Sequence, residues 1–162
     1  MAFSHFFAII TFAALLYTVQ GQYTRVRKCQ SFKGKLANDS VSISSCEAAP
    51  CKLRKKSDVL VTVKFTPETD IEKFVTLVHI KLIGIPFPFI GVDGVSACGK
   101  VYEIDGKTKA SCPLKKGKQY MYQNSFKVLE IYPTVRGVVH WALHDADKKV
   151  DVSCFEILVK IS

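Results

Sequence analysis

The sequence of 162 residues predicts an all-β fold in which two sheets pack face to face. Apolar and polar side chains alternate with period two in several segments, and successive side chains of a strand point to opposite faces, so these segments are expected to be half-buried strands. Turn residues such as the Asp-Gly pairs at 93–94 and 105–106 separate the segments. Apolar residues rarely recur at the spacing of a helix. About seven short strands without a helix are typical of a β-sandwich.

The N-terminal segment, residues 1–21, is predicted to be a secretory signal peptide. It contains no Lys, Arg, Asp or Glu, and an apolar stretch at residues 6–16 is followed by small residues. That stretch is too short to span a bilayer, which needs about 20 apolar residues. A buried N-terminal helix is the alternative. We therefore expect one mature domain over residues 22–162, a normal size for a single hydrophobic core.

Seven strands are expected along the mature chain. The alternation is clearest at residues 59–65, 135–143 and 155–161. Further strands are expected at residues 27–32, 41–45, 74–83 and 119–129. Turn residues at 145–149 predict that the last two strands form a β-hairpin.

The cysteines indicate a disulfide-bonded protein of an oxidising compartment. Six cysteines lie in the mature part, an even number that predicts three disulfides: Cys29, Cys46, Cys51, Cys98, Cys112 and Cys154. Cys46 and Cys51 are close in sequence, as are Cys98 and Cys112, so these two local pairs are plausible. Cys29 and Cys154 would then join the first strand to the last. Spacing alone leaves fifteen connectivities open.

The mature chain is strongly basic. The formal net charge is +9, and basic residues cluster at 52–56 and 115–118. In a secreted protein this charge favours anionic membranes or acidic proteins as partners, and nucleic acid is not expected. Solvated loops that confer solubility are the alternative. Asn38 begins an Asn-Asp-Ser sequence, which is a potential N-glycosylation site.

No residue pattern indicates an enzyme, a cofactor or a metal site. The sequence contains no Gly-x-Ser-x-Gly elbow, no His-Glu-x-x-His pair and no phosphate-binding Gly-rich loop. His140 and His144 have the spacing of a metal pair on a helix, but on a strand they lie roughly 13 Å apart. Since Zn–N bonds are about 2.0–2.1 Å long, these two histidines cannot bind one ion together.

Residues 84–91 form an apolar segment with two prolines. Each proline removes a hydrogen-bond donor, so the segment cannot be a central strand. A segment this apolar is expected to be buried, to pack against a partner or to stand at the mouth of an apolar cavity. A second apolar-aromatic corner at residues 127–133 can frame such a mouth with it.

The mature chain resembles the ML (MD-two-related lipid-recognition) domain family over its whole length. The branch that it resembles most is that of the Niemann-Pick type C two, or epididymal secretory, sterol carriers, and group-two mite allergens are more distant. The motifs that carry the resemblance are Gly84-Ile85-Pro86-Phe87-Pro88-Phe89, Cys98, Cys112-Pro113, Tyr120-x-Tyr122, Tyr132-Pro133, Val138-Val139-His140-Trp141 and Cys154-Phe155-Glu156-Ile157.

The resemblance implies an immunoglobulin-like sandwich of two antiparallel sheets that separate to admit an apolar ligand. It implies the disulfides Cys29–Cys154, Cys46–Cys51 and Cys98–Cys112. The residues of the entrance would be Phe89, Val128 and Tyr132. The residues of the cavity would be Leu53, Val61, Val63, Val78, Phe87, Val139, Trp141, Phe155 and Ile157.

The function implied is that of a monomeric, non-enzymatic carrier of one sterol, such as cholesterol, or of one fatty acid. It would act in extracellular fluid or in the lumen of the endosome or lysosome, with an anionic membrane or a membrane sterol receptor as its partner. An innate-immune protein that binds microbial lipids such as lipopolysaccharide is one alternative, and a sandwich without a physiological ligand is another. Three departures from the carriers bear on the ligand: a longer loop between Cys98 and Cys112, Phe155 in place of Trp, and Phe87 in place of a smaller aliphatic residue.

Overall fold

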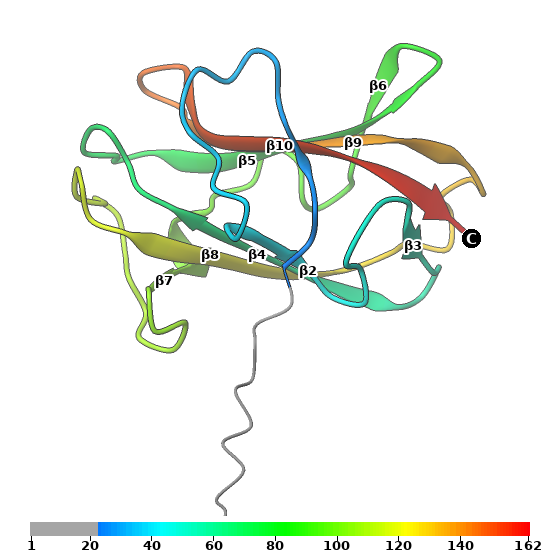
Figure 1. Ribbon diagram of the computed structural model, residues 1–162, viewed down its shortest axis with the longest axis horizontal. Coiled ribbons are helices and arrows are strands. Elements are labelled where there is room, and N and C mark those ends of the chain that lie inside the picture. Colours follow the sequence, from blue (N-terminus) through cyan, green and yellow to red (C-terminus); the bar gives the residue numbers. More distant parts are fainter. Residues whose placement is uncertain (1–22) are drawn as a thin grey trace, which may run out of the picture.

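Two β-sheets pack face to face in the computed structural model, which describes residues 23–162 (Figure 1). The predicted signal peptide, residues 1–21, lies outside the described residues. The first sheet has the order β1 (Arg27–Lys28), β10 (Val150–Ile161), β9 (Arg136–Asp145), β5 (Phe74–Leu82) and β6 (Ile85–Pro88), and β3 (Cys51–Leu53) pairs with β10. The second sheet has the order β2 (Val41–Ile43), β4 (Asp58–Phe65), β8 (Tyr120–Lys127) and β7 (Val101–Glu103).

The seven predicted strands are present, and their alternation determines which side chains are buried. Along β4, the side chains of Val59, Val61, Val63 and Phe65 are buried and those between them are not. The ladders are antiparallel, apart from the parallel pair of β3 with β10. Residues 146–149 join β9 to β10 as a hairpin, as predicted. Three short strands, β3, β6 and β7, were not predicted.

The first strand is much shorter than predicted. The expected range was 27–32, but β1 ends at Lys28. Beyond it the chain turns, and the Phe32 N–H donates a hydrogen bond of 3.2 Å to the carbonyl oxygen of Cys29. Cys29 is bonded to Cys154 on β10, and this link holds the turn against the sheet.

The apolar segment with two prolines forms the edge strand β6, so the prediction that it is not a central strand is confirmed. Pro86 and Pro88 are tolerated there because an edge strand has one unpaired side. Ile83 and Gly84 connect β5 to β6 with positive φ angles of 51° and 80°. A left-handed conformation is unusual for a β-branched residue, and the Ile83 side chain is fully exposed. In Figure 1 this hairpin projects away from the sandwich.

The three disulfides that the resemblance implies are all present: Cys29–Cys154, Cys46–Cys51 and Cys98–Cys112. The last of these pins the short 3₁₀ turn η1 (Cys98–Lys100). Across residues 23–162, no helix has the length and apolar character needed to cross a membrane. The main hydrophobic core lies between the two sheets, where the inward-facing side chains of both meet.

Candidate functional site

A narrow apolar cavity of about 20 Å³ lies between the two sheets. It is formed by inward-facing side chains of β2, β3, β4, β8, β9 and β10, together with one residue that follows β6. The residues that line it are Ile43, Cys51, Leu53, Val59, Val61, Phe89, Phe126, Val139, Trp141, Phe155, Ile157 and Val159. No charged residue is among them.

Aromatic rings from both sheets meet at this cavity. Trp141 on β9 and Phe155 on β10 are cross-strand partners, and their rings stack with centroids 6.2 Å apart. Phe126 on β8 of the other sheet lies 5.8 Å from the Trp141 ring and 5.9 Å from the Phe89 ring. The cavity is therefore bounded by polarisable ring surfaces that need no hydrogen-bond partner from a ligand.

The two apolar corners that the sequence singled out meet at one end of the cavity. Phe89 lines the cavity and packs edge-to-face on Tyr132, with ring centroids 5.4 Å apart. The Tyr132 hydroxyl accepts a hydrogen bond of 2.9 Å from the N–H of Ile90, and burial raises the pKa of this hydroxyl. Val128, four residues before Tyr132 in the chain, is fully buried, and its carbonyl oxygen accepts a hydrogen bond from the N–H of Lys56. We call this end, defined by Phe89, Val128 and Tyr132, the mouth.

A lipid, the ligand that the resemblance implies, would need a wider cavity. Sites for small molecules usually have volumes of about 300–1,000 Å³, far above the volume present. The two sheets are joined at the mouth by side-chain packing and by the Tyr132–Ile90 hydrogen bond, so separation there breaks few polar contacts. An apolar molecule placed between the sheets would replace these contacts with buried surface of its own.

Most of the residues predicted for the cavity lie at its wall: Leu53, Val61, Val139, Trp141, Phe155 and Ile157. Val63 and Val78 are fully buried in the core but do not line the cavity. Phe87 lies elsewhere, because its side chain is 47% exposed. It pairs with Ile80 and shares the inner face of the sheet, but β6 is the edge strand, so the Phe87 side chain stays partly exposed there.

Sequence reasoning missed five lining residues: Ile43, Cys51, Val59, Phe126 and Val159. Val59 and Val159 belong to the same alternating sets as Val61 and Ile157, so the alternation held enough information to find them. Phe126 required the register of β8 with β4, in which it pairs with Val59. Cys51 and Ile43 are buried residues of the short strands β3 and β2, whose pairing partners could not be read from the sequence.

The two basic clusters lie at opposite ends of the sandwich. Residues 52–56 are at the mouth, since Leu53 lines the cavity and Lys56 bonds to Val128. Residues 115–118 come just before β8, and the mouth comes just after it. The length of β8, eight residues or roughly 23 Å, therefore separates this cluster from the mouth. Lys115 there forms an ion pair with Asp70.

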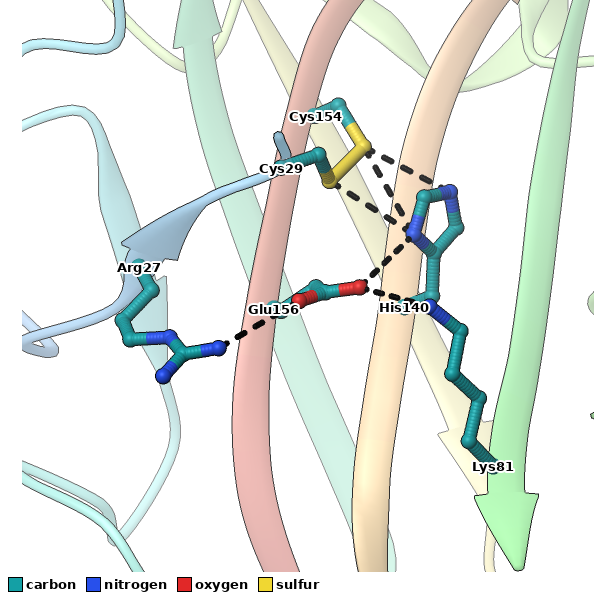
Figure 2. Close-up of polar contacts among 6 residues, drawn as sticks. All are labelled: Arg27, Cys29, Lys81, His140, Cys154 and Glu156. Atoms are coloured by element: carbon teal, nitrogen blue, oxygen red, sulfur yellow. Dashed lines mark hydrogen bonds and ion pairs between the residues drawn. A yellow bond between two sulfur atoms is a disulfide. The ribbon is translucent and has the colours of Figure 1, made fainter. Parts of the chain in front are cut away.

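On the outer face of the first sheet, Glu156 is the centre of a polar cluster (Figure 2). Its carboxylate lies 2.9 Å from Lys81 Nζ, 3.5 Å from His140 Nδ1 and 3.7 Å from an Arg27 nitrogen. The hydrogen bond from Lys81 holds the pKa of Glu156 below its usual value, against the effect of burial. The sulfur atoms of Cys29 and Cys154 lie 3.5 Å from ring nitrogens of His140. These sulfurs are bonded to each other, so they offer no thiolate ligands.

His144 has a separate partner, since its Nδ1 lies 2.8 Å from Asp151. Asn38, the potential glycosylation site, is an exposed residue of a turn.

Comparisons with known proteins identify a family and several relatives that this chain resembles. The family model described as the ML domain matches residues 23–161. The chain is 35% identical to the mouse protein named NPC intracellular cholesterol transporter 2, over 96% of each chain. It is 34% identical to the Drosophila melanogaster protein named NPC intracellular cholesterol transporter 2 homolog a, over 96% of this chain and 97% of that one. A solved structure of a Niemann-Pick type C2 protein from Japanese carpenter ant matches with a TM-score of 0.68 and 26% identity, over 85% of this chain and 98% of that one.

Proposed function

This chain belongs to the ML-domain family, and on that premise we propose that it carries one sterol molecule between its two sheets. The observation that supports this most directly is the apolar cavity, lined from both sheets and closed at the mouth by Phe89 and Tyr132. A fatty acid fits the same lining, and relatives named as cholesterol transporters favour the sterol. Catalysis forms no part of the proposal.

The energy for binding comes from burial of apolar surface. A sterol removes a few hundred Å² of its own surface from water, and at about 25 cal/mol per Å² this contributes several kcal/mol. That gain offsets the cost of separating the sheets and of shifting the Phe89 ring from its contacts with Phe126 and Tyr132. The polar end of the sterol remains at the mouth, where water reaches it.

We propose that the protein meets membranes with its mouth. Exposed apolar side chains surround this end, including Ile83, Ile85, Ile90 and Ile131. On the outer face of the sheet nearby, the exposed side chains of Lys52, Lys160 and Arg136 are cross-strand neighbours. Like charges side by side destabilise a sheet. Near an anionic bilayer, however, each Lys or Arg side chain contributes about 1 kcal/mol of attraction, so a membrane partner would offset this cost.

We infer secretion and action as a monomer outside the cell or in an endosomal or lysosomal lumen. The three disulfides support an oxidising compartment. Glycosylation of Asn38 belongs to the same proposal, and its exposure in a turn supports it.

Fluorescence of Trp141, the only Trp in the chain, provides the test because its ring lines the cavity. Titration of the mature protein with cholesterol is expected to change this fluorescence and to saturate at one sterol per chain. Binding of lipopolysaccharide but not of cholesterol or fatty acids would instead support the immune alternative. A protein that binds none of these lipids would contradict the carrier proposal.

Transfer of sterol to vesicles tests the membrane contact. Arg54→Glu at the mouth is expected to slow transfer to vesicles that contain anionic lipid, and Lys116→Glu at the opposite end is the matched control. Equal rates in the two variants would refute contact through the mouth.

A further inference from the structure

Three polar side chains between the two sheets are buried without a hydrogen-bond partner. Among residues 23–162, the unpartnered atoms include the Tyr122 hydroxyl, the Asn124 amide nitrogen and the Trp141 ring nitrogen. Each of these residues is at most 4% exposed. A buried polar group that lacks a partner costs about 1–3 kcal/mol, and proteins contain few of them, so each one indicates a partner that the protein itself does not supply.

The three side chains lie together beside the cavity. Tyr122 and Asn124 share the inward face of β8 with Phe126, which lines the cavity. Asn124 is the cross-strand partner of Val61, another lining residue. From the opposite sheet, the Trp141 ring lines the cavity and packs edge-on against the Tyr122 ring, with centroids 6.4 Å apart. The unpartnered polar atoms therefore gather where a ligand between the sheets would meet them.

A half-buried lysine holds the Asn124 amide in one orientation. Lys100, the last residue of η1, donates a hydrogen bond of 2.7 Å from its Nζ to Asn124 Oδ1. Because an ammonium group can only donate, the amide oxygen must face Lys100, and the amide nitrogen is turned to the other side. Lys100 belongs to the loop between Cys98 and Cys112, which is longer than in the sterol carriers that the chain resembles, and a disulfide closes this loop.

No acidic group in the described part of the chain forms an ion pair with Lys100. Burial lowers the pKa of its ammonium group, and no acidic neighbour counteracts this effect. Burial also raises the pKa of the Tyr122 hydroxyl, and the Asn124 amide opposes this rise although the two groups form no hydrogen bond of normal geometry. We use the name inner polar cluster for Lys100, Tyr122, Asn124 and Trp141.

The chemistry of this cluster suits a carboxylate. The Asn124 amide nitrogen and the Trp141 ring nitrogen can only donate, and the Tyr122 hydroxyl can donate as well. Lys100 adds a positive charge behind these donors. Hydrogen bonds to an ionised acceptor are about twice as strong as those between neutral groups. A buried charge is stable only when it is both paired and hydrogen-bonded, and the cluster provides a carboxylate with both.

We propose that the inner polar cluster binds the carboxylate of a long-chain fatty acid. This inference rests on the proposed function, because the fatty acid uses the same cavity as the sterol. Tyr122 is six positions from Val128 at the mouth, roughly 20 Å along a strand, so the extended acyl chain runs from the cluster towards the mouth. The polar end of the fatty acid is therefore buried, whereas that of a sterol remains at the mouth.

Titration of Trp141 fluorescence with palmitate, hexadecanol and cholesterol tests this proposal on the mature, disulfide-bonded protein. Palmitate and hexadecanol have the same chain length and differ in the charge of the head group. Lys100→Met is expected to weaken palmitate binding about tenfold or more and to change the other two affinities by less than about twofold. Lys109→Met is the matched control, because Lys109 lies in the same loop but donates to the Gly99 carbonyl oxygen at an exposed position.

Tyr122→Phe separates a contact with the ligand from a structural role. This change removes only a hydroxyl that has no partner in the protein, so the lipid-free variant is expected to be at least as stable in urea as the wild type. Palmitate binding is nevertheless expected to weaken about tenfold, because the carboxylate loses a donor. A structural role of the hydroxyl would instead lower the stability and weaken the binding of all three lipids.

The outcomes distinguish this inference from the carrier proposal. The inference is overturned if the wild-type protein binds cholesterol but not palmitate, or if palmitate binding is unchanged in both Lys100→Met and Tyr122→Phe; the carrier proposal then stands. It is also overturned if Lys109→Met weakens palmitate binding as much as Lys100→Met does. A wild-type protein that binds none of the three lipids would refute both proposals.

Discussion

We expect the Tyr132 hydroxyl to control how easily the mouth opens. It accepts the Ile90 N–H at 2.9 Å, and Ile90 directly follows Phe89. Tyr132→Phe removes this single atom and keeps the ring that packs on Phe89. One hydrogen bond contributes about 0.5–1.5 kcal/mol, and the lower half of that range applies because Ile90 is exposed and water can replace the hydroxyl. If opening of this contact limits release, sterol leaves about two- to fivefold faster.

Stopped-flow transfer of cholesterol to neutral vesicles, followed by Trp141 fluorescence, measures that rate. Tyr120→Phe is the matched control: the Tyr120 hydroxyl also accepts a backbone N–H at 2.9 Å, that of Lys115, but at the far end of β8. The control is expected to lose similar stability without a change in release. Release that is unchanged in Tyr132→Phe, or equally accelerated in both variants, would refute the reasoning.

Three further predictions concern stability and are checked by urea denaturation. In Gly137→Ala, the new Cβ would approach the Lys81 carbonyl oxygen to 2.9 Å, so a loss of about 1–3 kcal/mol is expected, while Gly99→Ala, with nothing within 4 Å, is expected to be nearly neutral. Burial works to raise the pKa of Asp145, but hydrogen bonds from Lys148 and Asp147 outweigh it and leave the pKa lowered. The stability that this carboxylate contributes is therefore present above about pH 4 and lost as the pH falls through its folded-state pKa; Asp145→Asn should flatten that part of the pH profile, and an unchanged profile would contradict this. Replacement of both Cys29 and Cys154 by Ser removes a link between positions 125 residues apart and is expected to cost about 4–5 kcal/mol; a cost below about 2 kcal/mol would contradict the chain-entropy argument.

The fold class could be predicted because it depends on local information. Burial of one face requires every second side chain to be apolar, and this period is visible in β4, β9 and β10 without knowledge of their partners. The cavity residues were named from the family resemblance, and most of those that line the cavity, such as Val61, Val139 and Ile157, are inward positions of the same alternation. The strands β3, β6 and β7 escaped detection because three or four residues carry too little of the period.

Pairing between distant strands was decided only in the tertiary structure. The alternation says that His140 faces outward but not that His79 and Glu156 flank it, because that depends on the register of three strands. Phe87 has the chemistry of a cavity residue, and its place on an edge strand leaves it exposed instead. The basic residues 52–56 are at the mouth because the parallel pairing of β3 with the end of β10 brings them there. A period along the chain determines which face a side chain takes, whereas its neighbours on that face are set by contacts between segments far apart in sequence.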